Sequence, residues 1–153
     1  MAQWFELGLH GLLIGLASTA LMTSLESMFW RRWGLTGVLE WHENQVIWSK
    51  LSGSDPSVLS VFGIFSLHFL NGGLAGVPFP ILAGQLSPLL VIWLGLVYGA
   101  LLWVLTLFPI HRTVTGVPIV GHPMGKGPVA ASLVGHLVYG LSLGAVTTAG
   151  RTW

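Results

Sequence analysis

The stretch Leu89–Phe108 has the sequence LLVIWLGLVYGALLWVLTLF and contains no charged side chain. A helix of this length, at a rise of about 1.5 Å per residue, reaches across a hydrocarbon core of roughly 30 Å. Three further stretches are as long or longer and nearly free of charge, namely Trp4–Trp30, Val58–Leu82 and Val129–Thr148. Together the four stretches predict an all-α integral membrane bundle of four transmembrane helices.

The composition of the chain is typical of a membrane protein. Hydrophobic residues make up 53% and charged residues 7% of the 153 residues, and the mean hydropathy is +0.78, whereas a soluble domain carries about 25% charged residues. The length predicts a single membrane domain, 1–153, with spans at about 5–30, 57–80, 88–108 and 128–148. No Lys or Arg precedes the first span, which is too long for the apolar part of a signal peptide, so we expect it to be retained.

The bulk charge and the absence of cysteine exclude several functions. The net charge of +1 creates no strong field that would recruit nucleic acid. Without cysteine there are no disulfides, thiolate metal sites or covalently attached c-type haem. We expect the partners to be membrane lipids and either other integral membrane subunits or further copies of this chain.

The basic residues predict how the chain is oriented in the cell membrane. Five of the six lie in the loops after the first and third spans, and one lies on the other side: Arg31, Arg32, Lys50, Arg112 and Lys126 against Arg151. Under the positive-inside rule, loops 31–57 and 110–127 are cytoplasmic and both termini lie outside.

Prolines predict where helices begin and end. A proline suits the first helical position, where its missing N–H would have no partner, so Pro56, Pro88 and Pro128 predict the starts of three spans. Pro109 predicts the end of the third span. Pro78 and Pro80 predict a kink or an end of the second span near Val77.

The first cytoplasmic loop is too apolar for a plain linker. Its segment at about 37–51 mixes residues such as Trp41 and Trp48 with Glu40, Glu43 and Lys50. This mixture favours a short helix lying along the membrane interface. Docking of the segment on a partner protein is the alternative.

Small residues recur at intervals of four in every span. The second and fourth spans share the pattern H-x3-G-x3-G, which suggests a duplicated two-helix hairpin. Glycines at this spacing let helices in a bilayer approach closely. The predicted packing residues are Gly11, Gly15, Gly72, Gly76, Gly95, Gly99, Gly140 and Gly144.

The histidines of that shared pattern, His68 and His136, are the main candidates for a functional site. Both are predicted to lie near the middle of the bilayer, where an ionisable residue is costly and points to function. Two neutral imidazoles on separate helices are the usual axial ligands of b-type haem, and the glycine one turn after each would leave room for the macrocycle. The alternatives are a proton or substrate relay, or plain hydrogen bonds to Tyr98, Tyr139, Asn71, Ser66 or a backbone carbonyl.

Other polar residues within the spans could join such a relay. Glu6 and His10 share one face of the first helix near its outer end, where they form either a braced metal ligand or an interfacial anchor. Glu26 lies near the inner end of the same helix and either joins a relay or pairs with a nearby Arg. Asn71 lies in the second span.

The cytoplasmic side collects ionisable residues whose spacing matches no metal signature: Glu40, His42, Glu43, His111, His122 and Lys126. We expect them to form a solvated or partner-contacting surface, and we assign no metal site. No nucleophile elbow, P-loop or dinucleotide fingerprint occurs in the chain, so we do not expect an enzyme.

The run Gly15-Leu-Ala-Ser-Thr-Ala-Leu-Met-Thr23, together with the His136–Gly144 pattern, resembles small multi-spanning prokaryotic membrane proteins of no assigned function. The resemblance implies a compact helical membrane fold and no activity.

Three functions follow as hypotheses. The first is a small non-catalytic membrane subunit that packs within a larger complex, which by analogy could be a respiratory or redox complex. The second is a protein that binds b-type haem or a metal through His68 and His136. The third is a small oligomeric transporter or channel with an intramembrane histidine relay.

Overall fold

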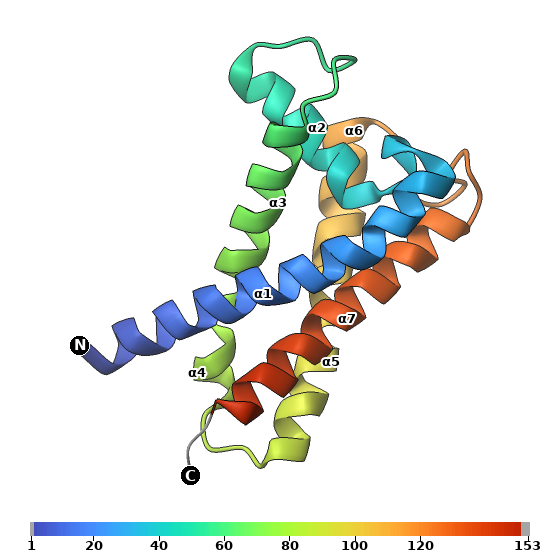
Figure 1. Cartoon of the computed structure of the whole chain (residues 1–153). Helices are drawn as coiled ribbons and strands as arrows, with labels where there is room; N and C mark the ends of the chain where they lie inside the picture. The colour runs from blue at the N-terminus through green and yellow to red at the C-terminus, as the bar shows by residue number, and fades with distance from the viewer. Residues whose placement is uncertain (1, 151–153) are drawn as a thin grey trace.

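The computed structural model describes residues 2–150 and is helical throughout (Figure 1). Four helical segments are long and apolar enough to cross a membrane, namely Gln3–Trp33, Val61–Ala83, Pro88–Thr115 and Gly127–Ala149. The predicted fold, an all-α bundle with four candidate spans and one shorter helix, is confirmed. Arg151 and the C-terminus, which entered the topology prediction, lie outside the described residues.

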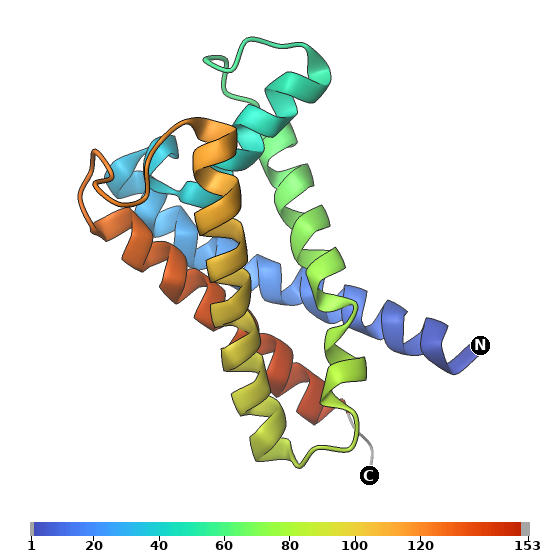
Figure 2. The ribbon, with the colours of Figure 1, turned by 180° about the vertical axis from the view of Figure 1, so that it is seen from behind.

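The elements follow one another as α1 (Ala2–Trp33), η1 (Leu35–Gly37), α2 (Leu39–Ser52), α3 (Val61–Gly76), α4 (Phe79–Ala83), α5 (Pro88–Thr106), η2 (Leu107–His111), α6 (Arg112–Thr115) and α7 (Gly127–Ala149). Helix α1 packs against both α3 and α7, and α5 packs along α7. Helix α2 lies across one end of the bundle, against α3 and α6 (Figures 1 and 2). We call this end, which also carries the 116–126 loop, the loop end.

Glycines line the two closest helix crossings. A Cβ atom added to Gly11 or to Gly15 of α1 would lie 2.6 Å from a carbonyl oxygen of α3, that of Gly76 or of Gly72 respectively. At the second crossing, a Cβ on Gly95 of α5 would collide with the carbonyl group of Gly140 in α7. Only glycine permits backbones to lie this close. The two crossings use the shared H-x3-G-x3-G pattern in the same way, once in α3 and once in α7.

Proline positions explain two of the helix ends. Pro88 and Pro128 lie in the first turns of α5 and α7, as predicted. Helix α3 ends at Gly76, just before Pro78, and resumes as the short α4, which agrees with the predicted break near Val77. The break between α3 and α4 leaves backbone carbonyls without a helical partner. The Ala75 carbonyl accepts a 2.6 Å hydrogen bond from Tyr98 Oη.

Two proline predictions are wrong. Pro56 does not begin a helix, because the Asp55 side chain accepts a 2.8 Å hydrogen bond from the Ser57 N–H and holds residues 55–57 in a turn. Helix α3 begins at Val61 instead, capped by the Ser60 hydroxyl. Pro109 does not end the third span either. A single π-helical turn, η2, accommodates the residue without an N–H, and the helix continues to Thr115.

Helix α2 buries most of its polar side chains, although Lys50 near its end is exposed. Glu40 and Glu43 are 8% and 7% exposed, and Trp41 is 1% exposed. Trp41 packs with Val38 and Ile64 in a small core beneath the helix. A second core at the middle of the bundle contains Phe79, Tyr139 and Leu143 among others. The helix therefore closes the loop end and inserts two carboxylates into the bundle.

Candidate intramembrane acid–histidine site

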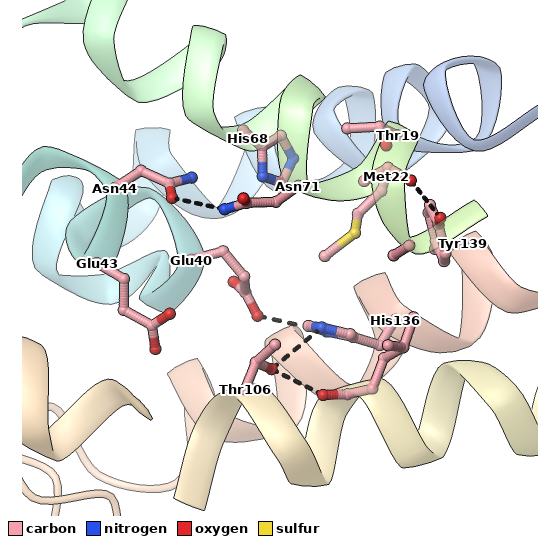
Figure 3. Close-up of a pocket in the computed structure, with 13 residues that line it drawn as sticks. Thr19, Met22, Glu40, Glu43, Asn44, His68, Asn71, Thr106, His136 and Tyr139 are labelled. Atoms are coloured by element: carbon pink, nitrogen blue, oxygen red, sulfur yellow. Dashed lines mark hydrogen bonds and ion pairs between the residues drawn. The ribbon is translucent and has the colours of Figure 1, made fainter. Parts of the chain in front are cut away.

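A cavity of about 100 Å³ lies between α3 and α5, below α2 (Figure 3). Five helices contribute to its wall: Thr19 and Met22 of α1, Glu40, Glu43 and Asn44 of α2, His68, Asn71, Gly72 and Ala75 of α3, Leu102 and Thr106 of α5, and His136 and Tyr139 of α7. The cavity therefore exists only in the folded bundle. Both histidines singled out from the sequence, together with Asn71, lie on its wall.

His68 faces a carboxylate of α1. Its Nε2 lies 3.2 Å from Glu26 Oε2, and both side chains are buried, at 6% and 1% exposure. The same oxygen accepts a 2.7 Å hydrogen bond from Trp41 Nε1. Glu26 therefore joins α1, α2 and α3, whereas a bond to a nearby Arg was the alternative considered from sequence.

His136 is held in one tautomer when neutral. Its Nδ1 lies 3.0 Å from the Ser132 carbonyl oxygen, which can only accept, so Nδ1 carries a proton. Its Nε2 lies 3.4 Å from Thr106 Oγ1, whose proton is donated to the Leu102 carbonyl oxygen at 3.0 Å. Glu40 Oε1 lies 3.4 Å from Nδ1 and also accepts a hydrogen bond from the Ser132 hydroxyl. A second carboxylate–imidazole pair thus lies between α2 and α7.

A third pair lies next to it at the loop end. His111 Nδ1 is 2.9 Å from Glu43 Oε1, and His111 is fully buried. Burial raises the pKa of the Glu43 carboxyl, and the nearby Glu40 acts in the same direction. Glu40 and Glu43 are three residues apart on α2 and share one face, so this single helix supplies two of the three carboxylates.

Two further imidazoles lie around His111. The ring of His42 lies 5.9 Å from that of His111. Burial, followed by the nearby His111 and His122, lowers the pKa of His42 to about 4. Burial and His111 also lower the pKa of His122. Both imidazoles are therefore weaker bases than a free histidine side chain, and His42 is neutral at pH 7.

Several polar atoms in this region are buried without a hydrogen-bond partner, which is rare and calls for an explanation. They include Glu26 Oε1, Glu40 Oε2, His42 Nδ1, His111 Nε2 and His122 Nε2. Every one belongs to the acid–histidine cluster. Such atoms are costly to bury unless protons, water or a bound molecule satisfy them.

The residues do not fit a haem between His68 and His136. Cavities that hold small molecules measure about 300–1,000 Å³, well above the 100 Å³ found here. His136 Nδ1 is also engaged by the Ser132 carbonyl oxygen, and Thr106 Oγ1 lies 3.4 Å from Nε2. Across residues 2–150, no three His, Asp or Glu side chains converge in a way that could hold a metal ion.

Glu6 and His10 lie far from this cluster, near the N-terminal end of α1. Both are exposed and line a separate cavity of about 370 Å³ beside Pro80, Thr147 and Gly150. The structure therefore separates the relay candidates of the first span: Glu26 belongs to the cluster, and Glu6 and His10 do not.

The sequence did not reveal the cluster as a whole. Glu40, Glu43, His111 and His122 were expected on a solvated or partner-contacting surface, and this expectation is wrong, since their exposure is between 0% and 8%. His42 is partly buried, and Lys126 is exposed. The expected tyrosine partners bond to backbone instead, and Tyr139 Oη donates a 2.5 Å hydrogen bond to the Gly72 carbonyl. The spacing Glu40-x2-Glu43 was the signal that could have located the second and third pairs.

No family model, curated protein or solved structure matches this chain. Function is therefore inferred from the geometry of the site.

Proposed function

We propose that this protein moves protons across the membrane, as a small oligomeric transporter or channel with an intramembrane histidine relay. The observation that supports the proposal is the clustering of three buried carboxylate–imidazole pairs, Glu26–His68, Glu40–His136 and Glu43–His111. Ionisable residues in a membrane bundle are expensive to bury, and proton pathways are one of the few roles that require them.

The pairs are suited to passing protons. An imidazole can take up a proton on one ring nitrogen and release it from the other, and its usual pKa lies near neutrality. In the Glu43–His111 pair, Nδ1 faces the carboxylate while Nε2 has no partner, and the His42 ring lies 5.9 Å from the His111 ring. A proton arriving through His42 or His122 could thus reach His111 and then Glu43. Glu40, on the same face of α2, adjoins the cavity that His68 also lines.

The direction of the pathway follows from the charge distribution. The positive-inside rule assigns the loop end to the cytoplasm. In that orientation, His42 and His122 lie on α2 and in the 116–126 loop, on the cytoplasmic side, and His68 and His136 lie within the spans. Since four spans are few for a transporter, the proposal includes assembly of several copies.

The subunit hypothesis stays a prediction, and two of the features that suggested it are used within the chain itself. Trp41 is buried, and Trp48 fills the space beside Gly63. The glycine stripes form the crossings α1–α3 and α5–α7. Purification in mild detergent tests the hypothesis, because a subunit of a larger complex should bring other membrane chains with it at fixed stoichiometry.

Proton flux into proteoliposomes tests the proposed function. A pH-sensitive dye inside the vesicles reports the flux that follows an imposed potential. We expect Glu26→Gln and Glu43→Gln each to lower the flux at least about tenfold, because a neutral amide keeps the size and one acceptor of the carboxylate but cannot exchange a proton. Glu6→Gln, which neutralises an exposed carboxylate at the other end of α1, is the matched control and should leave the flux unchanged.

Two results of the flux measurement would contradict the proposed relay. If wild-type vesicles conduct no faster than empty ones, or if the Glu26→Gln, Glu43→Gln and Glu6→Gln proteins conduct alike, the relay is wrong. Circular dichroism and elution volume in detergent confirm that each variant is folded.

A further inference from the structure

We infer that the cavity between α3 and α5 opens sideways into the bilayer and binds the hydroxyl head of a membrane-dissolved amphiphile, such as a long-chain alcohol. This goes beyond proton movement, since such a molecule could bind whether or not protons flow. Four observations carry the inference: the side opening, the unpartnered polar atom at the depth of the cavity, its small volume, and its apolar rim.

The opening lies between two hydrogen bonds that tie α3 to its neighbours. On one side, Tyr98 Oη of α5 bonds to the Ala75 carbonyl, and on the other, Asn71 Nδ2 lies 3.4 Å from Asn44 Oδ1 of α2. Between these points α3 and α5 are separated by the cavity itself. Asn71 lines the cavity and is nevertheless exposed, so the wall is open at this position. Asn71 lies well inside the candidate span Val61–Ala83, and the opening therefore faces lipid.

The deep part of the cavity offers a polar atom without a partner. Glu40 Oε2 makes no hydrogen bond although the side chain is only 8% exposed, whereas the neighbouring His68 Nε2 is paired with Glu26. Figure 3 shows Glu40, His68 and Asn71 lying around one space. A carboxylate oxygen accepts hydrogen bonds, whereas the Asn71 amide can donate or accept. A hydroxyl, which both donates and accepts, satisfies this set.

The volume limits the head to a few atoms. About 100 Å³ corresponds to roughly three water molecules at the volume each occupies in the liquid. A phosphate-bearing lipid head would be too large and would also place negative charge beside Glu40. A hydroxyl with the first carbons of its chain fits.

The rim is suited to the chain that follows. Met22, Ala75 and Leu102 line the cavity beside the polar groups. The neighbouring side chains on the outer faces of the two helices, Leu74 of α3 and Leu105 of α5, are 55% and 59% exposed and lie at the level of the lipid. An alkyl chain leaving the cavity between α3 and α5 would pass Asn71 and then meet the apolar side chains of Leu74 and Leu105.

Photolabelling in nanodiscs tests the inference. The probe is hexadecanol with a diazirine near the hydroxyl, and mass spectrometry locates the adducts. We expect adducts on residues 68–76 and 98–106, displaced by unlabelled hexadecanol. The hexadecyl methyl ether, which cannot donate a hydrogen bond, should compete at least about tenfold more weakly, because one hydrogen bond to a charged group is lost.

Matched variants make the result specific. Ala75→Phe fills the opening and should lower labelling at least about tenfold. Val97→Phe adds a similar ring at an exposed position of α5 that does not line the cavity and should leave labelling unchanged. Equal labelling of the two variants, adducts spread evenly over all lipid-facing residues, or equal competition by alcohol and ether would each overturn the inference.

A second copy of the chain is the competing occupant. Because the sequence has no cysteine, Asn71→Cys introduces a single thiol at the opening. Disulfide dimers in the membrane would mean that another copy covers the cavity, which would also overturn the inference. The proposed function is tested separately. Specific labelling with unchanged flux in Glu26→Gln would remove the relay and leave the binding site. Lowered flux in Glu26→Gln without specific labelling would remove the binding site and leave the relay.

Discussion

Glu26 Oε2 and His68 Nε2 lie 3.2 Å apart on α1 and α3, and the same oxygen accepts the indole N–H of Trp41 from α2. Three helices therefore meet at one buried carboxylate. Since α2 is not itself a candidate span, this contact and the Glu40–His136 pair join it to the membrane core.

Removing only His68 from the Glu26–His68 pair should lower the free energy of unfolding more than replacing both residues with apolar ones. We expect His68→Ala to lower the free energy of unfolding by about 3 kcal/mol, because it leaves Glu26 buried without its imidazole. The double substitution Glu26→Leu with His68→Phe restores apolar packing and should cost less than His68→Ala alone. Unfolding by denaturant in mixed micelles measures both. A double variant less stable than His68→Ala would contradict the account of the pair.

The glycine crossings should tolerate no added carbon. Gly140→Ala places a Cβ against the backbone of α5, and we expect a loss of about 2 kcal/mol in the free energy of unfolding as the helices move apart. Gly8→Ala is the control, because its Cβ would meet only Val77 Cγ1 at 3.7 Å, an ordinary contact. This control should be neutral or gain up to about 1 kcal/mol from helix propensity. Equal effects at the two positions would show that the crossings are loosely packed.

The histidines at the loop end should make stability fall in acid. The pKa of His42 is lowered to about 4 in the folded protein and is 6.5 in the unfolded chain. As the pH drops from 6.5 to 4, the unfolded state takes up a proton that the folded state does not, so unfolding becomes easier. The raised pKa of Glu43 acts with the opposite sign, by reducing stability as the pH rises.

The contribution of His42 to the loss of stability in acid is therefore obtained by comparing wild type with His42→Phe. The His42 ring is only partly buried, so solvent screening reduces the effect. We expect wild type to lose about 1 kcal/mol more of its free energy of unfolding than His42→Phe over this pH range. Melting temperatures at pH 7 and pH 4.5 measure it. The wild type should lose more stability than the variant, and parallel curves would contradict the lowered pKa.

Gln45 should hold the connection between α2 and α3. Its side chain donates to the carbonyls of Pro56 and Val58, at 3.2 and 2.8 Å, and accepts from the Ser60 N–H at 2.9 Å. We expect Gln45→Ala to raise hydrogen exchange in residues 53–60 at least about tenfold, since these bonds have no replacement. Lys50→Ala, on the exposed side of the same helix, is the control and should leave the exchange unchanged.

Cysteine labelling should place the loop end on one side of the membrane. Ser54 and Val120 are exposed in the two loops, and Gln85 is exposed in the short connection before α5. Single cysteines at 54 and 120 should react with an impermeant maleimide only from the cytoplasmic side, and one at 85 only from the outside. Opposite sides for 54 and 120 would contradict the four-span arrangement.

Much of the fold follows from local sequence. The apolar stretches are long enough to locate the candidate spans, and the break at Pro78 follows from a missing N–H. The end expected at Pro109 failed because a wider helical turn accommodates a proline, and a pattern of single residues does not show that option.

The sequence by itself determined that the chain forms four apolar helices, because the transfer of side chains from water to hydrocarbon depends on composition and length alone. It could not determine the partners of Glu26, Glu40 and Glu43, since those depend on where α2 folds back. Only the tertiary structure decided that a loop helix supplies buried carboxylates to histidines far away in the chain. The physical reason is that the energy of a buried charge depends on its neighbours in space, and a linear pattern of charges reads the same whether the helix faces water or the bundle.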